Sequence, residues 1–175
     1  MARKRRTWLE VVGEIARYLG AVALLMVAAI HAQQYYDAYF SAVPTIGRLF
    51  MLNIVGASVT GLLLLAPVRL LGRRVGAAIL VPAALAGICV AAGAFTALVV
   101  SEYTPLFGFM ESGYRLAIEL SLLFEGLATL LLAAFIAAVA LDRREASRSG
   151  DSSRVGAARR QPKRPPSITG REKAA

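Results

Sequence analysis

Two glutamates lie within the last long apolar run of the chain, between 114 and 141. An ionisable group near the centre of a bilayer costs about 2.5–3.5 kcal/mol on the insertion scale, so Glu119 and Glu125 are candidate functional residues. At 100° per residue they lie roughly 120° apart around a helix, which argues against a pair of carboxylates working as acid and base. Glu119 also has a local interpretation, because Glu111, Arg115 and Glu119 form an (i, i+4) charge ladder.

Polar residues of other apolar runs fall at matching depths. At 1.5 Å per residue, Glu125 lies roughly 5 Å and Asn53 roughly 6 Å outward of the midpoints of their runs. His31, near the outer end of the first run, lies at the same depth as Glu119, and Arg48 lies near that depth. Residues at one depth can meet in the core of a helix bundle, so we predict an outward-facing polar pocket with Glu125 as a proton or cation carrier. The residues predicted to line this pocket are His31, Arg48, Asn53, Glu119 and Glu125. The alternative is that these groups satisfy one another and fix the register of the helices.

Aromatic side chains cluster just after the first apolar run. We expect an aromatic belt at the level of the outer headgroups, which is typical of membrane proteins. The alternative is a lid over the polar pocket. The residues of this predicted lid are Tyr35, Tyr36, Asp37, Tyr39 and Phe40.

The chain has one histidine and one cysteine. Cys89 lacks a second cysteine with which to form an internal disulfide or a dithiol motif. His31 with two carboxylates can in principle hold Zn²⁺, but the spacing carries no specific signal for such a site. We therefore predict no catalytic residue, no cofactor and no metal, and we expect a protein that is not an enzyme.

Apolar residues make up 57% of the 175 residues, and they occur in blocks. Blocks of about 20 apolar residues match a hydrocarbon core of roughly 30 Å. We predict an all-α polytopic membrane protein with four transmembrane helices in an antiparallel bundle. The predicted spans are 11–30, 46–71, 75–100 and 114–141. Thr45 is predicted to cap the helix that begins at Ile46.

The net charge of +9 is concentrated in three segments, which are 1–10, 69–74 and 142–175. The two other loops contain almost no Lys or Arg, so the positive-inside rule predicts that both termini are cytoplasmic in a bacterial plasma membrane. The alternative for the first run is a signal peptide cleaved near Ala28. The proline-containing basic segment 142–175 is predicted to be disordered and attracted to anionic inner-leaflet lipids. Nucleic acid is not an expected partner.

Small residues recur every four positions in two of the spans. Ala57 and Gly61 form one such pair, and Ala83, Gly87 and Ala91 form a stripe along the third span, beside a row of Ala84, Ile88 and Ala92. Such faces permit close approach of helices, either within the chain or to a membrane-protein partner or a second copy. Glu14 and Arg17, at (i, i+3) spacing, are expected to pair or to reach the interface.

Three stretches carry a resemblance to known proteins. They are H-x-x-Q-Y-Y-D-A-Y from His31, V-P-T-I-G-R-L-F-M-L-N from Val43, and L-F-G-F-M-E from Leu106. Together with the fourth run, they resemble uncharacterised small four-helix integral membrane proteins of actinobacteria, and more distantly the layout of DoxX-like membrane proteins. The resemblance implies a bacterial plasma-membrane protein and no established activity.

These observations favour a non-enzymatic accessory or packing subunit of a larger membrane system. The alternative is a small transporter or channel that uses the outward-facing pocket, with Glu125 as carrier. A membrane redox subunit is a third interpretation. The single histidine and the lack of cysteine pairs argue against it.

Overall fold

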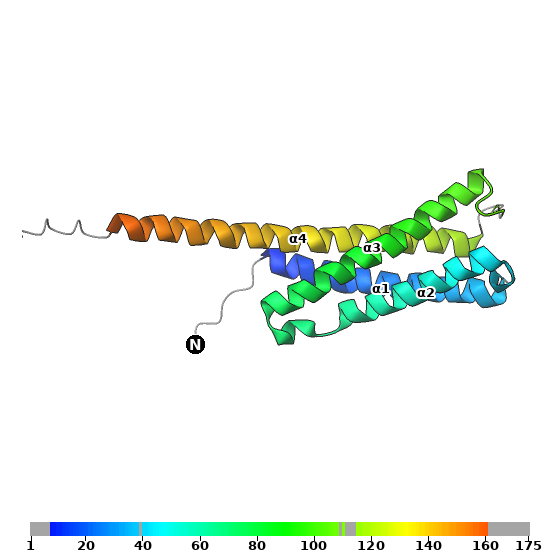
Figure 1. The fold of residues 1–175 in the computed structure, drawn as a ribbon, viewed down its shortest axis with the longest axis horizontal. Helices are drawn as coiled ribbons and strands as arrows, with labels where there is room; N and C mark the ends of the chain where they lie inside the picture. The colour runs from blue at the N-terminus through cyan, green and yellow to red at the C-terminus, as the bar shows by residue number, and fades with distance from the viewer. Residues whose placement is uncertain (1–7, 39, 109, 111–114, 161–175) are drawn as a thin grey trace, which may run out of the picture. The chain divides into compact units, whose positions relative to one another are not determined.

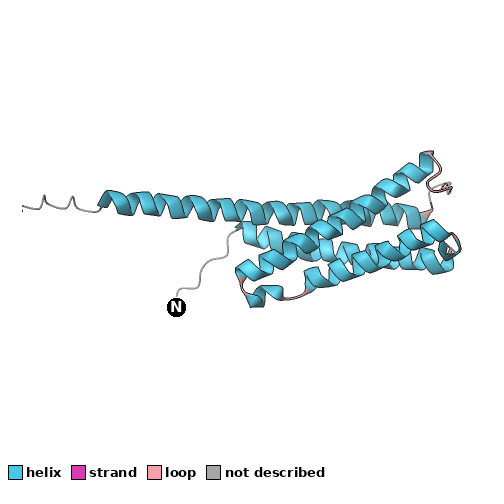
Figure 2. Cartoon of the chain, in the orientation of Figure 1, coloured by secondary structure: helices cyan, strands magenta, loops and turns pink. Residues whose placement is uncertain are grey.

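The computed structural model describes residues 8–38, 40–108, 110 and 115–160. Helices and short connections account for all of them (Figures 1 and 2). The chain divides into two compact units, Met1–Asp142 and Arg143–Ala175. The helices of the first unit are α1 (Trp8–Asp37), α2 (Pro44–Leu65), α3 (Arg73–Tyr103) and the first part of α4 (Leu116–Arg160). Two short 3₁₀ helices, η1 (Phe40–Ala42) and η2 (Val68–Leu71), lie in the connections.

Four of the described helical segments are long and apolar enough to cross a membrane. They are Trp8–Asp37, Pro44–Leu65, Val75–Tyr103 and Leu116–Glu145. The prediction of an all-helical chain with four such segments is therefore confirmed. The first segment extends past its predicted end, because His31–Asp37 continues α1 rather than beginning a loop. The second ends earlier than predicted, at Leu65, because Pro67 lacks the backbone N–H that would continue the helix.

The helix α2 begins at Pro44, so the prediction that Thr45 caps a helix starting at Ile46 is wrong. Val43 is the N-cap residue, and it makes no side-chain capping hydrogen bond. Proline suits the first helical position because its fixed φ is already helical and the missing N–H would have no partner there. Gly47 allows η1 to fold back onto α2, since a Cβ at this position would lie 3.0 Å from the Phe40 carbonyl oxygen. This fold-back holds Phe40 against the first turns of α2.

The core is built from alanine and leucine on all four helices. Its closest approaches occur at glycines, where an added Cβ would meet a neighbouring side chain. At Gly20 of α1 that Cβ would lie 2.8 Å from Leu132 of α4, and at Gly87 of α3 it would lie 2.8 Å from Leu24 of α1. Gly61 of α2 approaches α1 in the same way, next to Leu25. The small-residue faces predicted from the sequence therefore pack within the chain.

The opposite faces of these helices carry large exposed apolar side chains. Examples are Val22 on α1, Leu62 on α2, Leu85 on α3 and Leu130 on α4, each at least half exposed. In water such a surface would be a strong aggregation hazard, but in a bilayer it faces a solvent as apolar as itself. The distribution of side chains is compatible with a multi-pass membrane protein.

Arg17 is buried near the start of α1, and its guanidinium lies 3.0 Å from Glu14 Oε2. It also lies over the ring of Tyr18, at 4.2 Å from the ring centroid. The pairing expected from the (i, i+3) spacing is thus present.

The second unit begins within α4, which continues to Arg160. Residues 142–160 are therefore described as helical, and the disorder expected over 142–175 stays a prediction. The stretch contains six Arg and three Ala and has no proline before Pro162, and extending an existing helix needs no new nucleation. Residues 161–175, the rest of that predicted segment, lie outside the described residues, as do 1–7 of the predicted basic N-terminus.

Candidate functional site

The site is centred on a buried contact between α1 and α4. His31 Nε2 lies 3.6 Å from Glu125 Oε1, and the Glu125 side chain is fully buried. The two helices come this close because Gly20 of α1 accommodates Leu132 of α4 two to three turns away. His31 and Glu125, which are far apart in the sequence, thereby form one pair in the interior of the protein.

Two further hydrogen bonds attach neighbouring side chains to this pair. Ser121, one turn before Glu125 on α4, donates its hydroxyl to Glu125 Oε1 at 3.0 Å. Asn53 of α2 places its Nδ2 3.3 Å from His31 Nε2. The site therefore joins three helices through one continuous set of polar contacts.

The contacts of His31 constrain where protons lie. Its Nδ1 lies 3.0 Å from the Val27 carbonyl oxygen, which can only accept, so Nδ1 carries a hydrogen. In the neutral ring Nε2 is then an acceptor, and Asn53 donates to it. Glu125 Oε1 faces the same nitrogen, and two facing lone pairs repel each other. A proton on either the Glu125 carboxyl group or His31 Nε2 removes this repulsion. In both forms the pair holds one transferable proton and has no net charge.

Two buried acceptor atoms of the site have no partner among the described residues. They are Glu125 Oε2 and Asn53 Oδ1. An acceptor buried without a hydrogen bond costs about 1–3 kcal/mol, so each atom has a strong tendency to receive a donor from a water molecule or a ligand. The pair is therefore a site with unused hydrogen-bonding capacity.

Aromatic rings enclose the imidazole on the side of α2. The ring of Phe50 lies 5.1 Å from that of His31, and Phe40 stacks on Phe50 at 4.9 Å. Phe40 comes from η1, whose position depends on Gly47. This stack limits contact between the pair and bulk water.

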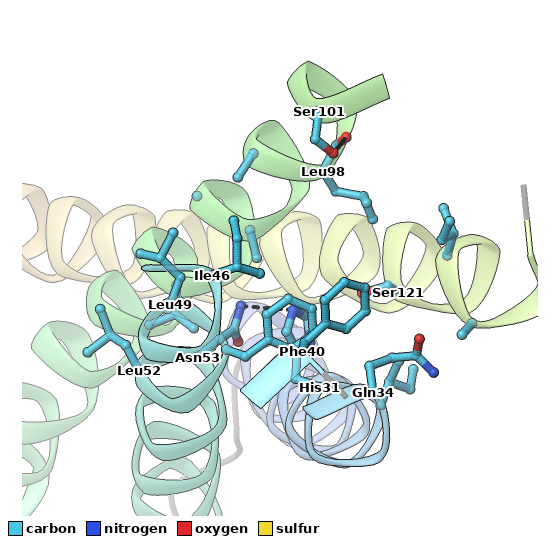
Figure 3. A pocket seen from close by; sticks show the side chains of 18 of the residues that line it. His31, Gln34, Phe40, Ile46, Leu49, Leu52, Asn53, Leu98, Ser101 and Ser121 are labelled. Atoms are coloured by element: carbon cyan, nitrogen blue, oxygen red, sulfur yellow. Dashed lines mark hydrogen bonds between the residues drawn. The ribbon is translucent and has the colours of Figure 1, made fainter. Parts of the chain in front are cut away.

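A cavity of about 550 Å³ lies beside the pair, between residues of all four helices (Figure 3). Small-molecule sites in proteins have volumes of about 300–1,000 Å³ and are mostly apolar with a few polar groups. The cavity matches this description, since its wall is largely aliphatic and aromatic. The polar side chains that line it are His31, Gln34, Asn53, Ser101, Arg115 and Ser121. Glu125 lies behind Ser121 and is not among the lining residues.

The structure brings together three of the five residues predicted to form the pocket, namely His31, Asn53 and Glu125. Arg48 and Glu119 are exposed and do not line the cavity. Position along the helix places all five at similar depths, but only three point inward. The orientation of a side chain around its helix depends on packing that depth matching does not include.

Of the predicted lid, Phe40 lines the cavity. Tyr35 and Tyr36 contact each other edge to face at 5.0 Å, and neither they nor Asp37 lines it. Tyr39 lies outside the described residues. Because His31–Asp37 is helical, these side chains point around α1 rather than across the cavity.

Ser121 and Gln34 are functional candidates that we did not place in the pocket. Ser121 precedes Glu125 by four residues, and Gln34 follows His31 by three, so helical spacing alone contains a signal for both. Among the described residues no group of three His, Cys, Asp or Glu side chains is arranged to hold a metal ion. What the site can do is hold a proton and present hydrogen-bonding groups to an apolar cavity.

No family model, no curated protein and no solved structure matches this chain. The resemblance to small actinobacterial membrane proteins and to DoxX-like proteins stays a prediction.

Proposed function

We propose that this chain is a small proton-coupled transporter, in which the His31–Glu125 pair carries the proton and the adjacent cavity holds the transported molecule. The observation that carries the proposal is the pair itself. Its two members come from different helices, are buried, and face each other at 3.6 Å, where a proton on either one removes the repulsion between them. Adding or removing that proton changes the charge of a buried site by one unit, which is a strong electrostatic signal to anything in the cavity.

A carrier fits the geometry better than an open channel. Beyond Glu125, the interior is filled by side chains that are fully buried, including Leu24 of α1 with Leu132 and Phe135 of α4. A proton or a molecule can cross this region only if the helices move between two arrangements. We therefore expect slow, saturable transport.

In this proposal the four helices form an antiparallel bundle in a bacterial plasma membrane, with both termini in the cytoplasm and η1 at the outer surface. The basic segments 1–10, 69–74 and 142–175 support that orientation. The first span is retained, since Ala21, Leu24 and Val27 belong to the core. The basic C-terminal segment contacts anionic lipids of the inner leaflet. A C-terminal alkaline phosphatase fusion, which is active only outside the cytoplasm, should be inactive, and an active fusion would contradict the orientation.

An accessory role in a larger membrane system is less well supported. The small-residue faces that favoured it, on α2 and α3, are occupied by Leu24, Leu25 and Leu132 of the same chain. A binding face for a partner or a second copy would have to lie elsewhere.

The experiment is proton flux into vesicles that contain the full-length protein and an internal pH-sensitive dye. An inward proton gradient is imposed at constant salt. We expect wild-type vesicles to acidify faster than empty vesicles, and Glu125→Gln vesicles to acidify at the empty rate. Glu119→Gln is the matched control, because Glu119 lies on the same helix but is exposed. Equal rates for wild type and Glu125→Gln, or for wild type and empty vesicles, would refute the proposal.

A further inference from the structure

The cavity occupies a wedge between α2 and α3. The two helices are in close contact at Gly56 and Val90, where a Cβ on the glycine would lie 3.0 Å from the valine side chain. Toward η1, residues of both helices line the cavity. They include Leu49 and Leu52 on α2 (Figure 3) and Gly93 and Ala97 on α3. The helices thus diverge from the Gly56–Val90 contact, and the cavity fills the space between them.

The wedge is open at the surface of the helix bundle, between α2 and α3. Leu52 and Leu49 line the cavity and are nevertheless 67% and 40% exposed. On α3, Cys89 and Gly93 line it and are exposed, and a Cβ at Gly93 would meet nothing within 4 Å. The rim consists of Leu, Cys and Gly, and all four rim residues lie inside the membrane-spanning segments of α2 and α3. The opening therefore faces the hydrocarbon of the bilayer.

A molecule that reaches the cavity through this opening must be soluble in lipid. Among the lining residues that the structure describes, Arg115 is the only Lys, Arg, Asp or Glu, and it is exposed near the start of α4. The rest of the wall provides no charge to hold a phosphate or carboxylate headgroup. The wall thus favours a neutral molecule with an apolar body.

Asn53, on the inner wall of the cavity, indicates which polar group that molecule carries. Asn53 lines the cavity, is 8% exposed, and has a buried Oδ1 without a partner among the described residues. When the proton is on Glu125, His31 Nε2 accepts from Asn53 Nδ2, so the group that Asn53 still offers is an acceptor. An unfilled acceptor selects a ligand that brings a donor, because a hydrocarbon would leave the atom unsatisfied.

We infer that the cavity binds a lipid-soluble neutral alcohol, which enters from the bilayer between α2 and α3 and donates its hydroxyl group to Asn53 Oδ1. The inference rests on the proposed function, in that it names the class of molecule that the transporter takes. The hydroxyl group then lies beside His31, whose Nε2 faces the transferable proton.

Photo-labelling of the full-length protein in nanodiscs tests this inference. The probes are 1-hexadecanol with a mid-chain diazirine and the matched diazirine hexadecane, which lacks the hydroxyl group. Labelled positions are mapped by peptide mass spectrometry. We expect the alcohol to label cavity residues roughly two- to tenfold more than the hydrocarbon, the range expected from one hydrogen bond. Asn53→Leu, which keeps the volume and removes the acceptor, should abolish this preference.

A second pair of variants tests the route and does not depend on Asn53. Leu52→Trp places a large ring at the rim and should reduce cavity labelling by both probes. Leu62→Trp is the matched control, since Leu62 is an exposed leucine on α2 outside the cavity lining, and it should leave labelling unchanged. Equal labelling by the two probes in the wild type would refute the claim that the cavity prefers an alcohol. Undiminished labelling of Leu52→Trp would refute entry between α2 and α3.

The outcomes separate this inference from the proposed function. Glu125-dependent proton flux without preferential alcohol labelling would refute only the inference. Preferential labelling without proton flux would show a lipid-alcohol site that is not coupled to protons, and would refute the transporter.

Discussion

Removal of His31 alone should destabilise the protein more than removal of both members of the His31–Glu125 pair. In His31→Leu, the carboxyl group of Glu125 stays fully buried without its partner, and Asn53 Nδ2 loses its acceptor. When Glu125 is ionised, this leaves a buried charge without its partner, which costs about 3–5 kcal/mol. Glu125→Leu is less harmful, because neutral His31 keeps its bonds to Val27 and Asn53, and only the Ser121 hydroxyl loses its acceptor. We expect a loss of about 1–2 kcal/mol for that variant.

The double variant His31→Leu/Glu125→Leu replaces the pair with two apolar side chains of suitable size. Such replacements are often neutral or stabilising in other proteins, so the double variant should be more stable than His31→Leu by about 2–3 kcal/mol. The assay is unfolding of the full-length chain in mixed micelles by titration with dodecyl sulfate, followed by far-ultraviolet circular dichroism. Glu119→Leu, at an exposed position on the same helix, is the control and should match the wild type. A His31→Leu variant as stable as the double variant would refute the reasoning.

Three further outcomes follow from single contacts. Gly87→Ala should lower the thermal midpoint in detergent, because its Cβ would lie within 2.9 Å of two buried leucine side chains, and overpacking costs about 1–3 kcal/mol. Gly93→Ala, on the same helix with nothing within 4 Å, should raise the thermal midpoint, because alanine stabilises the helix by up to about 1 kcal/mol relative to glycine. A lower midpoint for Gly93→Ala than for Gly87→Ala would contradict the packing described. Ser121→Ala removes the hydroxyl group that donates to Glu125 and should shift the carboxyl infrared band of Glu125, whereas Thr129→Val, which loses only a bond to a backbone carbonyl, should not.

The number of helices could be predicted from the sequence because it depends on properties that sum along the chain. Each span is a run of apolar residues of bilayer length, and no long-range contact is needed to recognise it. The predicted ends of the helices were less accurate than the predicted number of helices. The polar stretch His31–Asp37 continues α1 although its composition is typical of a loop, and α2 starts at Pro44 rather than at Ile46. These ends depend on η1 and on the fold-back permitted by Gly47, which no local pattern reports.

The candidate site was partly predictable for the same reason. Depth along a helix increases by a fixed rise for each residue, so His31, Asn53 and Glu125 could be matched by their positions within the apolar runs alone. Rotation about the helix axis is set by packing, here by contacts such as those at Gly20 and Gly87. This is why Arg48 and Glu119, at comparable depth, point outward. The cavity results from the divergence of α2 and α3, a property of two helices together that neither sequence contains alone.

The depth of Glu125 makes the pair sensitive to the electric field across the membrane. Nine residues separate it from Leu116, the first residue of α4, which corresponds to roughly 13 Å of a hydrocarbon core of about 30 Å. One elementary charge crossing the whole core changes its energy by about 2.3 kcal/mol per 100 mV, so a proton that reaches the pair from the η1 end gains about 1 kcal/mol at a resting potential of roughly that size. With η1 outside, a negative cell interior would raise the occupancy of the pair about fivefold over a membrane at zero potential. A polarised cell would thus load this site with protons that a depolarised cell leaves in the medium.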